Sequence, residues 1–167
     1  MNTKRGLPNP EAVKAWVIQL LKDADTLVEE ERAEGTSMSF ATALQVQKAI
    51  MASLVTGLYA PPARLMALKT MGLPSLNGRC EDPDCLYEDC KGNGFELPPE
   101  GGINMHFWHG KTESWQRENF KFEFFIEAGL LSKLLIRHIE EGLKVLAPNS
   151  EFLFVNHMGR LYVCLHV

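Results

Sequence analysis

Residues 9–28 read NPEAVKAWVIQLLKDADTLV, and this stretch sets the helical character of the predicted fold. Asn9 supplies an N-cap, Pro10 suits the first helical position, and Glu11 places an acid in the first turn. Apolar residues then recur at helical spacing, which predicts an amphipathic helix that ends near Gly35. The residues on this apolar stripe are Val13, Trp16, Val17, Leu20, Leu21, Ala24, Leu27 and Val28.

Three further helices are predicted along the chain. Serines near residues 37–39 can cap a second helix that ends around Gly57. Pro61 and Pro62 restart the chain, and since proline is tolerated in the first turn of a helix, a third helix is predicted over 63–71. Residues 128–146 carry a clear apolar stripe and predict the last helix. The residues predicted to be buried on the second helix are Phe40, Leu44, Met51, Leu54 and Val55.

Strand signals lie between the third and the last helix. Residues 103–108 and 120–126 are rich in β-branched and aromatic residues and flank a polar segment, which predicts a hairpin with a long turn. Residues 72–102 hold six glycines, four prolines and three cysteines without sustained periodicity, and predict a long ordered or metal-tied excursion. Residues 152–155 predict a short apolar strand or buried turn. The predicted fold class is mainly α with a small antiparallel β-hairpin or sheet (α+β).

Composition bounds the class of protein. With 167 residues, of which 46% are hydrophobic and 23% charged, the chain is predicted to form a soluble globular protein with a substantial core. The first ten residues have no apolar signal-peptide region, and no window reaches the ~18 apolar residues of a membrane span. We therefore expect a protein of the nucleus or cytoplasm that is neither secreted nor bound to a membrane.

The net charge of -4 argues mildly against nucleic-acid binding, because Lys and Arg supply most of the affinity for phosphates. The acidic residues are concentrated between Asp23 and Glu34 and between Glu81 and Glu100. This distribution leaves room for a basic face elsewhere on the molecule.

The cysteines indicate reduced thiols or a metal site rather than disulfides. Cys80, Cys85 and Cys90 are evenly spaced in a loop rich in Gly and Asp, and His106 and His109 follow. Three thiolates and the imidazole of His106 would complete a closed tetrahedral zinc site that orders the loop and takes no part in chemistry. The alternatives are reduced cysteines that pack as small apolar residues and a His106 that packs across the strands.

Three segments resemble those of the tyrosine recombinases in their order. Residues 56–68, TGLYAPPARLMAL, are similar to the helix–turn–helix around the first catalytic arginine of that family, and HGKT at 109–112 is similar to its hairpin with the catalytic lysine. A helix and then Leu153-Phe154-Val155 and Gly159-Arg160 resemble the approach to its second motif. The resemblance covers roughly residues 40–162 and is closest to the Crypton-like branch of eukaryotic, especially algal, mobile elements.

The resemblance implies residue roles and a division of the chain. Arg64 would clamp the non-bridging oxygens of the attacked phosphate, and Lys111 would protonate the departing 5′ oxygen as a general acid. Arg64, Lys111, His109 and Thr112 would contact double-stranded DNA, on which the protein can self-associate. Residues 1–36 would be an N-terminal helix at the end of a core-binding region. Residues 37–167 would be a partial catalytic domain with a cysteine-containing insert at 72–102.

The same resemblance predicts a protein that is inactive alone, and it needs no cofactor for its chemistry. The box HMGR at 157–160 mimics the family's HxxR motif, but it adjoins the apolar segment and contains a turn glycine, so we assign it to chance. Tyr162 lies too close to that turn to be the nucleophile. We therefore expect no covalent phosphotyrosine adduct with nicked DNA. The rival interpretations are a zinc-stabilised nucleic-acid- or protein-binding module without catalysis, and a purely structural helical protein.

Overall fold

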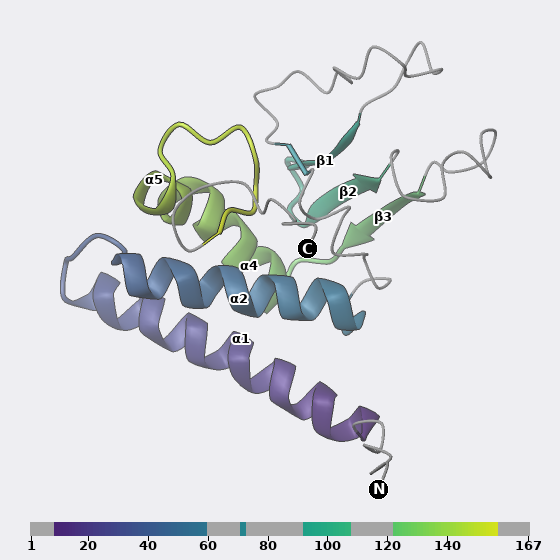
Figure 1. The fold of residues 1–167 in the computed structure, drawn as a ribbon, viewed down its shortest axis with the longest axis horizontal. Coiled ribbons are helices and arrows are strands. Elements are labelled where there is room, and N and C mark those ends of the chain that lie inside the picture. The colour runs from purple at the N-terminus through teal and green to yellow at the C-terminus, as the bar shows by residue number, and fades with distance from the viewer. Residues whose placement is uncertain (1–8, 60–70, 73–91, 108–121, 157–167) are drawn as a thin grey trace, which may run out of the picture.

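The computed structural model describes residues 9–59, 71–72, 92–107 and 122–156. The fold is mainly helical with a small antiparallel sheet, which confirms the predicted fold class (Figure 1). The helical elements are α1 (Pro10–Ala33), α2 (Phe40–Thr56), α4 (Leu130–Arg137), the π-helical turn η3 (His138–Gly142) and α5 (Leu143–Leu146). The strands are β1 (Asn93–Glu96), β2 (Ile103–Phe107) and β3 (Phe122–Ile126).

The first two helices begin and end where their capping residues predict. The Asn9 side chain accepts a hydrogen bond from the Glu11 amide, and the Ser39 side chain accepts one from the Thr42 amide. Gly57 ends α2 in the left-handed conformation that glycine adopts without steric cost. The predicted first and second helices are therefore confirmed at both ends.

A carboxylate ties the loop between these two helices together. Glu31 on α1 accepts hydrogen bonds from the Ser39 amide at 2.9 Å and from the Thr42 hydroxyl at 2.7 Å. Burial by itself raises the pKa of Glu31, but the hydrogen bonds from Ser39 and Thr42 outweigh it, so that the pKa lies below its ordinary value. The ionised carboxylate thus fixes the start of α2 against the end of α1.

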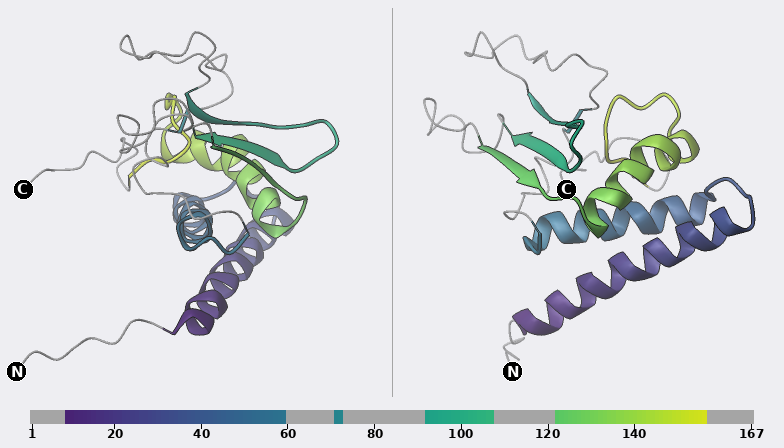
Figure 2. Two further views of the ribbon diagram at one scale, coloured as in Figure 1. Left: turned by 90° about the vertical axis from the view of Figure 1, so that its right-hand side faces the viewer. Right: turned by 180° about the vertical axis from the view of Figure 1, so that it is seen from behind.

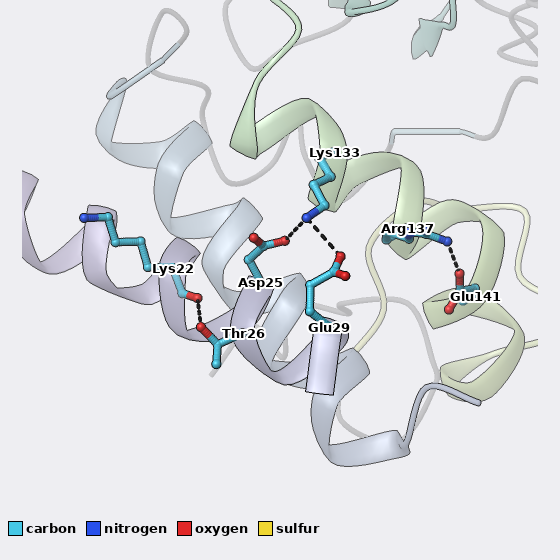
Figure 3. Close-up of polar contacts among 7 residues, drawn as sticks. All are labelled: Lys22, Asp25, Thr26, Glu29, Lys133, Arg137 and Glu141. Carbon is cyan, nitrogen blue, oxygen red and sulfur yellow. Dashed lines mark hydrogen bonds and ion pairs between the residues drawn. The ribbon is translucent and has the colours of Figure 1, made fainter. Parts of the chain in front are cut away.

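Helix α4 packs on both α1 and α2. Ion pairs join α4 to α1 (Figure 3). The Lys133 ammonium lies 2.6 Å from Asp25 Oδ1 and 3.0 Å from Glu29 Oε1. The hydrogen bonds to Asp25 and Glu29 raise the pKa of Lys133, and the hydrogen bond from Lys133 lowers the pKa of Glu29. Because Lys133 is 42% exposed, these pairs orient α4 more than they stabilise it.

The core joins the helices to one face of the sheet. Phe95, Ile103, Met105 and Ile126 are buried on that face, in one cluster with residues of α1, α2 and α4. Figure 2 shows the sheet beyond α4, away from the N-terminal half of α1. The buried residues of the two long helices are Val17, Leu21, Ala24, Val28, Ala43, Val46, Ala49, Ile50 and Leu54. Among the helices of the described ranges, none is both long and apolar enough to cross a membrane.

Some burial predictions are wrong. Phe40 and Val55 are predicted in the core but are 44% and 43% exposed. Phe40 is the first residue of α2, and Val55 points about 100° around the helix from the buried Leu54. Leu54 is buried as predicted, and Leu44 and Met51 are half-buried against the core. Trp16 on the apolar stripe of α1 is 56% exposed. The apolar stripe of each helix is therefore wider than the face that it buries.

The sheet is larger than the predicted hairpin. The hairpin is confirmed, since β2 pairs antiparallel with β3, with Ile103 opposite Ile126. Strand β1 pairs antiparallel with the other side of β2, so the end of the segment predicted as an excursion over 72–102 belongs to the sheet. Met71, predicted to end a helix, lies outside any helix, and Gly72 forms a β-bridge with Phe152. Residues 63–70 of that predicted helix lie outside the described residues.

Candidate nucleic-acid interface

Most of the predicted site residues lie outside the residues that the structure describes. Those residues are Arg64, His109, Lys111 and Thr112 of the predicted DNA contact, and Cys80, Cys85 and Cys90 of the predicted zinc site. The structure does describe the residues at which the segments carrying them join the fold. The described residues next to these segments are Met71 and Gly72 on one side and Phe107 and Phe122 on the other.

Backbone contacts at one end of the sheet link these residues, with Gly72 itself outside the three strands. The Gly72 amide donates a hydrogen bond of 2.9 Å to the Asn93 carbonyl, Asn93 pairs with Phe107, and Phe107 pairs with Phe122. Segment 60–70, with Arg64, leads to Met71 and Gly72. Segment 108–121, with Lys111, connects Phe107 to Phe122. The described residues that flank the two segments, Gly72 and Phe107, are therefore linked through Asn93.

The two segments start from linked residues. Gly72 is hydrogen-bonded to Asn93, and Asn93 is paired with Phe107, so one residue links Gly72 to Phe107. Arg64 precedes Gly72 by eight residues, and Lys111 follows Phe107 by four. A residue of extended chain spans up to about 3.5 Å, so the length of the chain alone does not keep Arg64 and Lys111 apart.

The segment at residues 152–155 pairs with the backbone of Met71 and Gly72. The Leu153 amide donates a hydrogen bond of 2.9 Å to the Met71 carbonyl, and Gly72 forms its bridge with Phe152. Met71, Leu153 and Phe154 are completely buried. The predicted short apolar strand or buried turn is thus a bridge between the sheet and the helices.

Gln47 on α2 fixes this segment from the helical side. Its side-chain Nε2 donates to the Val155 carbonyl at 2.6 Å, and its Oε1 accepts from the Val155 amide at 3.0 Å. The Gln47 side chain is buried, at 1% exposure. One amide thus satisfies both backbone groups of Val155, as a neighbouring β-strand would.

His138 fixes the same segment from η3. Its Nε2 lies 2.9 Å from the Leu153 carbonyl, and because a carbonyl only accepts, Nε2 carries the ring proton. The ring stacks on Phe154 with centroids 6.2 Å apart. Burial lowers the pKa of His138 to about 4, and the hydrogen bond to Leu153 offsets only part of this shift.

The π-helical turn makes room for the His138 ring. A Cβ added at Gly142 would lie only 2.8 Å from His138 Nδ1, so a larger residue does not fit there without displacing the ring. Nδ1 is buried without a hydrogen-bond partner in the described structure. The local widening of the helix and the bare Gly142 backbone therefore accommodate a neutral imidazole.

His106 is the one predicted site residue that the structure describes. It lies on β2 opposite Gly94 and Glu123 and is only 6% exposed. A Cβ at Gly94 would lie 3.0 Å from its Nε2, so the ring packs over the glycine backbone. The interpretation as a cross-strand packing residue is confirmed. Its role as a zinc ligand stays a prediction, and within the described ranges no three His, Cys, Asp or Glu side chains are grouped to hold a metal.

Comparison with known protein families, with curated proteins and with solved structures finds no match for this chain.

Proposed function

We propose that this chain is the DNA-binding part of a DNA breaking-rejoining enzyme of the tyrosine recombinase type, acting in DNA recombination and integration. Arg64 clamps the non-bridging oxygens of one backbone phosphate, and Lys111 approaches the same phosphate from the hairpin. His109 and Thr112 contact the neighbouring backbone. The observation that supports this proposal is the set of backbone contacts that links Gly72 through Asn93 to Phe107 and Phe122, the described residues next to the two segments.

The chemistry of the two side chains fits these roles. A phosphodiester under attack gathers negative charge on its non-bridging oxygens, and a planar, always-charged guanidinium can bind two of them at once. A lysine at a hairpin turn can deliver a proton to the departing oxygen. Gln47 and His138 bind the segment at residues 153–155, which in turn is hydrogen-bonded to Met71, the described residue that follows the Arg64 segment.

Replacing Arg64 with alanine is expected to weaken binding to duplex DNA by on the order of 2 kcal/mol, the scale for a charge-assisted hydrogen-bonded pair that is lost. Lysine at the same position keeps the charge but loses the two-pronged contact, so Arg64→Lys is expected to restore only part of the affinity. Fluorescence anisotropy with a labelled duplex at several salt concentrations measures both effects.

The matched control is Arg32→Ala, which removes an exposed arginine from the last turn of α1. It is expected to change affinity only slightly. Equal losses for Arg32→Ala and Arg64→Ala would mean that general charge, rather than a phosphate clamp, drives binding. The second candidate function, a zinc-stabilised binding module, predicts that Arg64→Ala leaves DNA affinity nearly unchanged and that a chelator weakens the fold.

A further inference from the structure

One face of the pair formed by α1 and α2 is exposed. Helix α4 packs on both helices from the other side, and its Lys133 contacts Asp25 and Glu29 of α1. Figure 2 shows α4 and the sheet gathered on that side. No residue of α1 before Val17 is buried, and Figure 1 shows this end of α1 running away from α2. The first two turns of α1 therefore extend beyond the core.

Three apolar side chains of α1 stand on this exposed face. Trp16 and Leu27 are 56% and 37% exposed, and Leu20 between them is half-buried. Since successive residues of a helix are about 100° apart, these three point within about 40° of one another. They lie on the side of Glu31, which binds α2, and roughly opposite Asp25, which binds α4. Tryptophan is among the residues that contribute most to protein interfaces.

Helix α2 adds smaller apolar side chains and a cation to the same face. Val55 is 43% exposed, Ala52 is half-buried and Lys48 is exposed. On α2, Thr42 binds α1 and Gln47 binds the segment at residues 153–155. The three exposed or half-buried residues point into the arc between these two contacts, with Ala52 nearest to α1.

The charges on the two helices are opposite. Asp23 of α1 points within about 20° of Trp16, and its carboxylate accepts a hydrogen bond of 2.7 Å from Gln19. Asp23 and Lys48 are both exposed, and neither forms an ion pair with another residue that the structure describes. One face thus carries an acid on α1 and a base on α2, and a second copy of the same face can pair with both.

The positions along the helices fit such a pairing. A two-fold axis parallel to the helices places α1 of one copy against α2 of the other at the same level. The two helices run antiparallel (Figure 1), and Glu31 of α1 contacts Thr42 of α2. Counted from that contact, Asp23 lies within about two residues, or about 3 Å, of the level of Lys48. The same count brings the exposed tryptophan of α1 level with the exposed valine of α2.

The area of this face is sufficient for a dimer. Helix α1 has 24 residues and α2 has 17, which at about 1.5 Å per residue gives lengths of about 36 and 25 Å. With a helix diameter of about 10 Å, the face covers roughly 600 Å² on each copy. Stable protein interfaces begin at about 1,200 Å² in total, so two such faces reach that size.

We infer that two copies of this chain associate through this face into a symmetric dimer. Trp16 of each copy packs on Ala52 and Val55 of the partner copy, and Asp23 pairs with Lys48 of the partner copy. A second copy fits because each helix offers what the other lacks. Large apolar side chains and an acid lie on α1, whereas small apolar side chains and a base lie on α2. The contact needs no DNA, so the inference is independent of the proposed function.

Sedimentation velocity of the full chain, without DNA and with a reductant for its four cysteines, tests this inference. The chain is expected to dimerise with a dissociation constant in the micromolar range, as for the smaller protein interfaces. Trp16→Ala is expected to weaken the dimer at least about tenfold. The control Leu97→Ala, which shortens a 44% exposed side chain between β1 and β2, is expected to leave dimerisation unchanged.

Charge reversal identifies the second copy as the occupant of the face. Asp23→Lys brings two lysines together in each pair and Lys48→Asp brings two aspartates together, so each variant alone is expected to dimerise about tenfold more weakly. Mixed in equal amounts, the two variants regain both ion pairs, and a heterodimer of nearly the original affinity is expected. Lys22→Asp reverses an exposed charge of α1 away from this face and is expected to change the affinity only slightly.

Three results would overturn the inference. They are a chain that stays monomeric up to about 1 mM, a Trp16→Ala variant that dimerises as tightly as the unaltered chain, and a mixture that forms no more dimer than either charge variant alone. A monomer would assign the face to another protein or to another part of this chain. Circular dichroism of each variant establishes that it is folded.

Discussion

Replacing Gln47 with methionine is expected to lower the free energy of unfolding by about 3 kcal/mol. Methionine keeps the length of the side chain but removes both hydrogen bonds to Val155, whose amide and carbonyl are then buried without partners. Each orphaned buried group costs about 1–3 kcal/mol, whereas the change in packing is small because the two side chains are similar in volume. Urea unfolding at neutral pH, followed by circular dichroism, measures the loss.

The control for this variant lies on the same helix. Gln45 is exposed on α2, two residues before Gln47, so Gln45→Met is expected to change stability by no more than about 0.5 kcal/mol. Similar losses in both variants would show that methionine disturbs the helix itself. A stability for Gln47→Met that equals that of the unaltered protein would contradict the bidentate contact to Val155.

The second large effect is a loss of stability in acid caused by His138. Its pKa is about 4 in the folded protein against an ordinary value of 6.5, so between these two pH values the unfolded chain binds more protons. The free energy of unfolding therefore falls as the pH falls from about 6.5 to about 4. Below pH 4, His138 causes no further loss. A shift of this size, at about 1.4 kcal/mol for each pKa unit, corresponds to a loss of about 3 kcal/mol.

His138→Gln isolates this contribution, since glutamine does not titrate. Urea unfolding at a series of pH values is expected to show a curve for His138→Gln that is flatter than that of the unaltered protein between pH 6.5 and 4. Glu29 and Glu31, whose pKa values are lowered, lose stabilising contacts at lower pH in both proteins, so their effect cancels in the comparison. Parallel curves would contradict the buried neutral imidazole.

The helices could be predicted from the sequence because their signals are local. Asn9, Ser39 and Gly57 mark helix ends through contacts within a few residues, and the structure places the ends there. The β2–β3 hairpin could also be predicted, because two apolar runs flank one polar segment in the sequence. These elements depend on capping and periodicity, which a sequence displays directly.

The features that were missed depend on distant partners. Strand β1 has only four residues, includes Gly94 and lacks an alternating pattern, so its pairing with β2 was not visible. Gln47 and His138 are polar residues within apolar helical stretches, and this was the available signal. Gln47 binds Val155, 108 residues away, and His138 binds Leu153, 15 residues away, and no local pattern reveals either partner.

The candidate site was predictable only as a set of residue types. Arg64 and Lys111 are predicted from motif order, and the structure adds the backbone contacts that link Gly72 through Asn93 to Phe107. Sequence spacing could not supply these contacts, because the hydrogen bond between Gly72 and Asn93 crosses the cysteine-containing segment. Both roles stay predictions.

A double-mutant cycle tests the convergence of these two side chains most directly. Affinity for a DNA duplex is measured for the unaltered chain, Arg64→Ala, Lys111→Ala and the double variant. If both side chains contact one phosphate, the two losses are expected to be non-additive, with a coupling energy of about 1 kcal/mol or more. Losses that add to within about 0.5 kcal/mol, or DNA binding that neither variant weakens, would contradict the proposed function.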